Sequence, residues 1–206
     1  CTCPIEDLEK TMERVSYKLL SYLAGEEIPA PERVVSREEP SYKTLSVSQV
    51  QSMPNVSIRK KKRWGFYGHS TINHDYNLKT IGGDKVVVDN ATGLMWHQSG
   101  SDDRMNQWEA EGRVEMLNSK GFAGYHDWRL PTVEEAVSLL EPSKKNGNLY
   151  IDPVFSKKQK HIWTGDKCHS KTAWTVRFGN GSVRWQLIGG NIFYHYRSFR
   201  PVRSVE

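Results

Sequence analysis

Cysteine and long apolar runs are both scarce in this chain of 206 residues. Three cysteines are too few for a disulfide-dense scaffold, and no stretch approaches the roughly 20 apolar residues that a membrane helix needs. The mean hydropathy is only -0.66. Seven Trp, nine Tyr and six Phe nevertheless argue against disorder, because disordered chains are poor in large apolar side chains. The length therefore fits one folded domain with an appendage.

Recognisable metal-binding and catalytic patterns are lacking as well. The seven His do not form an HExxH spacing, and the pair Cys1 and Cys3 has a single spacer residue with no second ligand pair at zinc-site spacing. Cys168 is followed by His169, but neighbouring residues of a strand point to opposite faces of a sheet. We therefore expect a protein that is not an enzyme, with no cofactor and no metal.

The first residue is Cys1 rather than Met, which indicates processing or trimming of the chain. A Cys at the first mature position is typical of a bacterial lipoprotein, where the thiol carries the lipid. A trimmed sequence that starts there by chance is the alternative. The lipoprotein interpretation predicts an extracytoplasmic protein anchored by a lipid on Cys1 to the outer membrane or cell surface. In that oxidising compartment a disulfide between Cys3 and Cys168 is chemically allowed, and the sequence leaves open whether it forms.

The N-terminal part is predicted to be a helix over residues 4–24, beginning at Pro4 and ending before Gly25. Its apolar residues recur every three and four positions: Ile5, Leu8, Met12, Val15, Leu19 and Tyr22. Either the helix packs on its own domain, or it is a membrane-proximal stalk that forms a homo-oligomer through residues 4–24. We divide the chain into a stalk over 1–25, a proline-containing linker over 26–43 and a folded domain over 44–206.

Charge is unevenly distributed along the chain. Residues 1–45 carry 9 acidic and 6 basic side chains, whereas residues 46–206 carry 15 acidic and 23 basic ones. The run of five cations over 59–63 is interpreted as a solvated surface turn, with binding of phosphate or sulfate groups as the alternative. Nucleic acid is not an expected partner, because no helix-turn-helix or zinc-finger pattern accompanies the positive charge.

The folded domain is predicted to be α+β, with two helices followed by antiparallel strands. A short helix is expected over 46–53. Further strands are expected at 85–89, 94–96, 162–164, 173–178, 182–185 and 200–203, with helices over 106–118 and from Thr132 through Leu140. Glu135 completes a capping box with Thr132. Trp108, Val114 and Leu117 are expected on the inner face of the first helix.

Four tryptophans lie in strand or strand-edge motifs and are expected in the core: Trp96, Trp128, Trp163 and Trp174. Asp127 and Arg129 flank one of them, which predicts a buried, hydrogen-bonded ion pair that fixes the loop before Pro131. A catalytic Asp127 is the less favoured alternative, because no nucleophile and base surround it in the sequence.

Taken in order, six motifs occupy residues 88–96, 121–132, 151–155, 162–164, 173–176 and 200–204. The set resembles the Legionella collagen-like protein C-terminal domain family, over roughly residues 44–205. The resemblance implies a C-type-lectin-like fold, distantly akin to the formylglycine-generating enzyme fold, preceded here by the N-terminal helix and linker. That enzyme fold works through active-site cysteines, and this domain has only Cys168, so a degenerate enzyme is the remote alternative.

Lectin-like folds present ligands on loops and strands near the C-terminus, so the resemblance places binding within residues 166–197. Aromatic, Arg and amide side chains are enriched there, as at recognition surfaces. The candidate ligand-binding residues are Asp166, Lys167, His169, Lys171, Arg177, Arg184, Trp185, Gln186, Asn191, Phe193, Tyr194, His195, Tyr196 and Arg197. We expect an external protein or glycan as the partner. The resemblance offers two finer versions: an adhesin for sulfated polysaccharide by charge attraction, and a variable protein of a diversity-generating retroelement with a diversified C-terminal surface.

Overall fold

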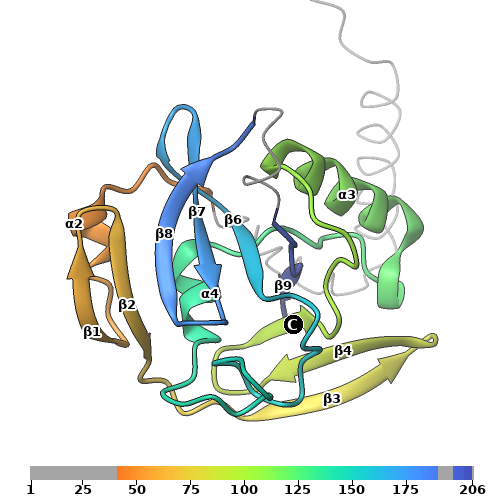
Figure 1. Cartoon of the computed structure of the whole chain (residues 1–206). Helices are drawn as coiled ribbons and strands as arrows, with labels where there is room; N and C mark the ends of the chain where they lie inside the picture. Colours follow the sequence, from red (N-terminus) through yellow and green to blue (C-terminus); the bar gives the residue numbers. More distant parts are fainter. Residues whose placement is uncertain (1–40, 190–196, 206) are drawn as a thin grey trace, which may run out of the picture. The chain divides into compact units, whose positions relative to one another are not determined.

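The computed structural model describes residues 41–189 and 197–205 of the chain. Over these residues the domain is α+β, which confirms the predicted class, with antiparallel strands in two sheets and few helices (Figure 1). The predicted helix over 4–24, the lipidation of Cys1 and most of the linker lie outside the described residues and stay predictions. No helix within the described ranges is long and apolar enough to cross a membrane.

The larger sheet has five strands in the order β1-β2-β8-β7-β6. Their bounds are Val56–Lys62 for β1, Gly65–Ser70 for β2, Ser182–Leu187 for β8, Thr172–Arg177 for β7 and His161–His169 for β6. The smaller sheet has the order β3-β4-β5-β9. Its strands are β3 Tyr76–Ile81, β4 Asp84–Asp89, β5 Leu94–His97 and β9 Val202–Ser204.

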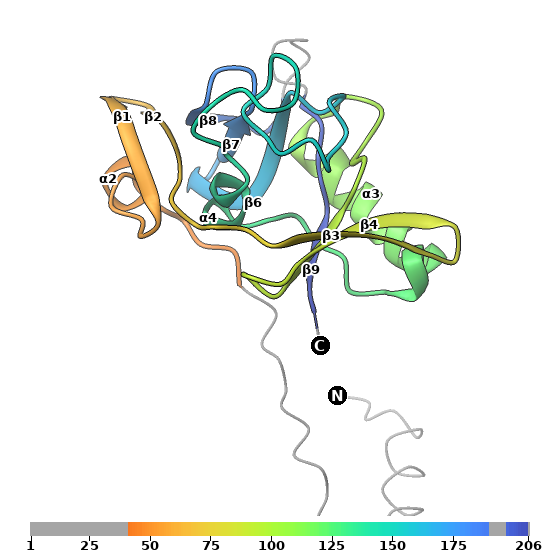
Figure 2. The ribbon, with the colours of Figure 1, turned by 90° about the horizontal axis from the view of Figure 1, so that it is seen from below.

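Three α-helices accompany the sheets over the described residues: α2 Val47–Val50, α3 Gln107–Lys120 and α4 Val133–Ser138. The predicted capping box at the start of α4 is confirmed, because Thr132 and Glu135 bond to each other's backbone N–H groups. Asn106 and Glu109 form a second capping box at the start of α3. The short 3-10 turn after α3, η1 Phe122–Gly124, lies against the β3–β4 hairpin (Figure 2).

The core has two parts, and the four predicted tryptophans are divided between them. Trp96 and Trp174 belong to the cluster that α4 forms with β7 and β8, whereas Trp128 and Trp163 belong to the cluster between α3 and the sheets. All four are at most 2% exposed, which confirms that they build the core. Three of the four indole N–H groups donate to backbone carbonyls, which satisfies the polar atoms of these rings.

The prediction for Trp108 is wrong. Its side chain is 59% exposed, whereas Val114 is buried as predicted and shares the inward face of α3 with Gln107 and Ala110. These three positions repeat at the spacing of one helix face. Gln107 turns inward because its amide nitrogen donates to the carbonyl of Thr164 inside the domain, and Trp108 is thereby rotated toward solvent.

The predicted ion pair between Asp127 and Arg129 is wrong, because each side chain pairs with a different residue. Arg129 forms a two-bonded pair with Glu135, and Asp127 pairs with Arg203 of β9. The side chain of Arg129 is mostly buried, at 9% exposure, whereas that of Asp127 is 44% exposed. The carboxylate and the guanidinium that flank Trp128 thus bind different parts of the domain, β9 and the start of α4.

Candidate functional site

The larger sheet has one face covered by α4 and an opposite face rich in cations. Val176 and Val183 point toward α4 and the core, so the alternate residues of these strands point the other way. The strand register brings together on that opposite face Lys60, Lys62, Tyr67, Arg177, Ser182, Arg184 and Gln186. We call this side of β1, β2, β8 and β7 the basic face (Figure 1).

Two further arginines reach this face from segments outside the sheet. Arg197 bonds to Met105 through backbone pairs of 2.8 and 2.9 Å, which also brings the neighbouring Arg104 into place. The next residue, Ser198, bridges to β6 beside His161. Three distant stretches of chain thus place four cations close together, and we call this set the arginine cluster: Arg104, Arg177, Arg184 and Arg197.

The arginines of the cluster lower one another's pKa values. Burial and then the three neighbouring arginines lower the pKa of Arg197 to about 10. Burial, followed by the charge of Arg177, lowers the pKa of Arg184. None of the ion pairs between described residues involves Arg104, Arg177 or Arg184. Among the described residues these three arginines therefore add positive charge to the face without an ion-pair partner of their own.

His161 lies among these arginines, and their positive charges lower the pKa of its imidazole. Burial, and then the charges of all four arginines, hold the pKa of its imidazole well below the usual value, so the ring is neutral. The Thr175 hydroxyl donates to the carbonyl of Arg184, at 2.8 Å, and therefore accepts from His161 Nε2, also at 2.8 Å. The ring proton consequently resides on Nε2.

Aromatic rings border the cluster on the side of β1 and β2. The guanidinium of Arg184 lies 5.9 Å from the ring centre of Trp64, and Trp64 meets Tyr67 edge to face at 5.7 Å. The run over 59–63, predicted as a turn, is mostly part of the edge strand β1. Exposed cations on an edge strand also discourage pairing with other chains.

Four of the predicted ligand-binding residues lie together in the structure, whereas one predicted residue is buried inside the domain. Arg177, Arg184, Gln186 and Arg197 lie together, and Arg197 Nη2 donates to Gln186 Oε1 at 2.7 Å. The prediction that Asp166 lies on the binding surface is wrong, because its side chain is only 3% exposed. Its two carboxylate oxygens accept the backbone N–H groups of Lys43 and Val133, both at 2.7 Å. It fixes the segment before α2 and the start of α4 rather than meeting a ligand.

Other predicted residues lie away from the basic face. Lys167 and His169 belong to the end of β6, and Lys171 lies in the turn before β7. Trp185 points to the α4 side, half-buried, with its ring 6.3 Å from that of His169. The remaining predicted residues lie outside the described residues: Asn191, Phe193, Tyr194, His195 and Tyr196. Sequence reasoning missed Arg104, Trp64 and Tyr67 because only the register brings them to the cluster.

The surroundings of Cys168 are those of a core residue rather than of a nucleophile. The side chain is 3% exposed, while His169 is exposed to solvent. Burial also raises the pKa of the Cys168 thiol, which disfavours the reactive thiolate. Over the described residues no group of three or more His, Cys, Asp or Glu is arranged to hold a metal ion.

Comparison with known proteins identifies a family. The model of a family described as the Lcl C-terminal domain matches residues 85–203, which includes all four arginines of the cluster but not Trp64 or Tyr67. No curated protein and no solved structure matches the chain.

Proposed function

Since the chain belongs to the Lcl C-terminal domain family, we propose that it is a non-enzymatic, lectin-like protein that binds an external protein or glycan. The binding surface is the basic face together with the segment that follows β8. The observation that carries this proposal is the arginine cluster beside Trp64 and Gln186. Guanidinium, amide and aromatic groups are the types that bury much area at recognition surfaces for little loss of entropy.

The environment of the titratable groups also favours binding over catalysis. An active nucleophile needs access and a nearby base, whereas Cys168 is buried and its neighbour His169 is exposed. The half-buried imidazole of His161 on this face is hydrogen-bonded to Thr175. Turnover of any substrate that Cys168→Ala abolishes would contradict this part of the proposal.

A binding screen tests the proposal directly. The full chain is applied to arrays of glycans, including sulfated ones, and of proteins, at several salt concentrations. We expect a specific ligand whose affinity falls by about tenfold or more in Arg184→Gln. The matched control is Arg113→Gln, which removes an exposed cation of α3. A ligand whose affinity responds equally to both variants argues against the basic face.

Attachment to sulfated polysaccharide is the second candidate, and the arginine cluster favours it. Attraction between exposed charges is screened over about 10 Å at 0.1 M salt. Binding that disappears at moderate salt thus supports charge attraction to sulfate groups. Binding that survives salt but is lost in Tyr194→Ala and Tyr196→Ala supports an aromatic protein-recognition surface.

The finer proposal of a diversified surface rests on the aromatic and amide residues within 191–196. It requires a near-copy of the 3′ coding sequence beside a reverse transcriptase gene. Sequencing of the genomic neighbourhood decides this, and absence of both features rejects diversification while leaving ligand binding in place.

A further inference from the structure

A cavity of about 240 Å³ lies beside α4, the helix that covers the face of the larger sheet opposite the basic face. Its aliphatic wall comes from three separate parts of the chain and consists of Pro54, Val56, Ile72 and Leu94. Its polar side chains are Asn55, Thr92, Glu134, Glu135 and Ser138. The lining thus combines an aliphatic wall with oxygen-bearing side chains, and the proposed function uses neither.

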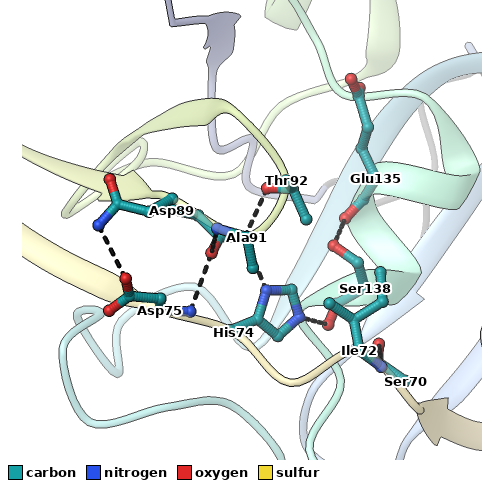
Figure 3. A network of polar contacts seen from close by, with 10 residues as sticks. Ser70, Ile72, His74, Asp75, Asp89, Ala91, Thr92, Glu135 and Ser138 are labelled. Atoms are coloured by element: carbon teal, nitrogen blue, oxygen red, sulfur yellow. Dashed lines mark hydrogen bonds and ion pairs between the residues drawn. The ribbon is translucent and has the colours of Figure 1, made fainter.

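Backbone hydrogen bonds fix the walls of this cavity. Asn55 has a left-handed backbone conformation with a φ of 57°, and its carbonyl accepts from the N–H of Thr71 at 2.9 Å. The N–H of Ile72 donates to the hydroxyl of Ser70 at 3.1 Å (Figure 3). The N–H of Ser70 in turn donates to the carbonyl of Leu140, just after α4, at 2.8 Å. The cavity is therefore built into the folded domain.

The hydroxyl protons around the cavity are already used inside the protein. Thr92 donates its hydroxyl to Asp89 Oδ2 at 2.5 Å, and Ser138 donates its hydroxyl to the carbonyl of Glu135 at 2.8 Å (Figure 3). Both hydroxyl oxygens can therefore only accept a hydrogen bond from a ligand. Ionised glutamates also only accept, so among the lining side chains only that of Asn55 has a donor. The lining thus selects a ligand that donates hydrogen bonds.

Glu134 gives the cavity a negative charge that the described residues do not compensate. The neighbouring carboxylate of Glu135 is neutralised by its two-bonded pair with Arg129. Glu134 is exposed and takes part in none of the ion pairs between described residues. An aliphatic wall beside a free carboxylate fits a ligand with an apolar stem and a cationic end, since such side chains bury the stem and keep the charge at the surface.

We propose that this cavity is a docking site for a lysine side chain of a partner protein. The stem lies against the aliphatic wall, and the ammonium donates to Glu134 and to the two hydroxyl oxygens. Lysine suits acceptors from separate elements because its ammonium has three rotatable donors, whereas the planar fork of arginine suits one carboxylate. The cavity is smaller than the roughly 300–1,000 Å³ of small-molecule pockets, which favours a single side chain. The site goes beyond the proposed function, because it lies apart from the basic face and takes a ligand of opposite charge.

The test follows the methyl resonances of Ile72 by NMR in the full chain, and the Ile72→Val spectrum assigns them. The probe is a glycine–lysine–glycine peptide with both ends capped, so that the side chain carries its only charge. The titration extends to on the order of 10 mM peptide, because a single side chain gives weak affinity. Salt is kept near about 0.1 M, where the charges of the distant basic face are screened. Sodium chloride at equal ionic strength is the control.

We expect the lysine peptide to shift the Ile72 resonances saturably, which sodium chloride does not reproduce. A norleucine peptide keeps the stem without the ammonium, and we expect it to bind at least about tenfold more weakly. Equal binding of the two peptides, or no saturable shift at all, overturns the proposal. The free amine n-pentylammonium is the probe for a small-molecule ligand. Binding of this amine more than about tenfold tighter than that of the lysine peptide overturns the assignment to a partner protein.

Variants of Glu134 test the acidic end of the site. We expect Glu134→Gln to bind the lysine peptide about tenfold more weakly, and Glu134→Asp to recover part of the affinity because the charge is kept. Glu115→Gln removes an exposed carboxylate of α3 and is the matched control, with unchanged affinity. Circular dichroism verifies that each variant is folded. Equal affinity of Glu134→Gln and wild type for the lysine peptide overturns the proposal and leaves the basic face unaffected.

Discussion

The imidazole of His74 donates from Nδ1 to Asp89 Oδ2 and from Nε2 to the carbonyl of Ser138, both at 2.7 Å (Figure 3). A carbonyl only accepts, and an ionised carboxylate only accepts, so both ring nitrogens carry protons and His74 is an imidazolium. Asp89 also accepts from the hydroxyl of Thr92 at 2.5 Å. Its side chain is 1% exposed and that of His74 is 7% exposed. This buried ion pair ties the segment before β3 to the β4–β5 turn and to the end of α4.

The pair predicts a stability that depends on pH in two directions. Burial lowers the pKa of His74, but its bonds to Asp89 and Ser138 outweigh burial and raise it above 6.5. Burial likewise raises the pKa of Asp89, but His74 and Thr92 lower it below 3.8. The stabilisation by His74 is full below pH 6.5 and is lost as pH rises through its folded pKa. That by Asp89 is full above pH 3.8 and is lost as pH falls.

Urea denaturation of wild type and His74→Gln at pH 5.5, 7.0 and 8.5 measures this effect. We expect the variant to lose on the order of 3 kcal/mol at pH 5.5, because it leaves Asp89 buried without its cation. The loss becomes smaller as pH rises. His169→Gln, at an exposed position, is the control and keeps the wild-type pH profile. Equal stability of His74→Gln and wild type at pH 5.5 rejects the ion pair.

Glu135 is predicted to stabilise the entry to α4. One carboxylate oxygen accepts from the backbone N–H of Thr132 at 2.8 Å, and both accept from the two Nη atoms of Arg129 at 2.7 and 2.8 Å. Glu135→Gln replaces an oxygen acceptor by a donor that faces other donors, so we expect a loss of about 2 kcal/mol. Glu134→Gln removes an exposed charge from the same turn. Chemical denaturation of the two variants must separate them; equal midpoints contradict this role.

Asp166 gives a prediction that separates structure from binding. Its carboxylate accepts two backbone N–H groups from inside the domain, and Asp166→Asn turns one acceptor into a donor. We expect the free energy of unfolding to fall by about 1–3 kcal/mol, while ligand affinity at the basic face is unchanged. Asp103→Asn, at an exposed position, controls for loss of charge. A large loss of affinity with unchanged stability would contradict this structural role and show that Asp166 contacts the ligand.

Local patterns were sufficient for much of the fold. The capping box of Thr132 and Glu135 lies within four residues, and the core tryptophans lie in apolar strand motifs, so both could be read from the sequence. Trp108 and Asp166 were misplaced because tertiary contacts decide which way they face: Gln107 displaces Trp108, and two distant N–H groups hold Asp166 inside.

The candidate site was predictable only in part for the same reason. Arg177, Arg184 and Arg197 fall in one C-terminal stretch that the resemblance indicated. Arg104 and Trp64 come from other parts of the chain, and only the bridge at residue 105 and the pairing of β2 with β8 bring them in. Nothing in the local sequence around residue 104 or 64 encodes that proximity.

Arg200 is predicted to be the least replaceable cation of the domain. Its side chain is fully buried, Nη1 donates to the carbonyls of His97 and Gln98, and Nη2 donates to Gln159 Oε1 at 3.1 Å. The guanidinium also lies 4.8 Å from the ring centre of Phe155. It therefore holds together the end of β5 and the loop before β6 around one planar group.

Arg200→Lys keeps the charge but replaces the fork by a single ammonium that cannot reach both sets of acceptors. Burial lowers the pKa of Arg200 to about 9, and a lysine with its lower ordinary pKa is more easily deprotonated in the same place. We expect Arg200→Lys to lose about 3 kcal/mol or more, because carbonyl groups are left buried and unpaired. Arg113→Lys, exposed on α3, should melt like wild type. If Arg200→Lys and Arg113→Lys have equal melting temperatures, the carbonyls around residue 200 have another source of hydrogen bonds. The guanidinium of Arg200 is then dispensable to the fold.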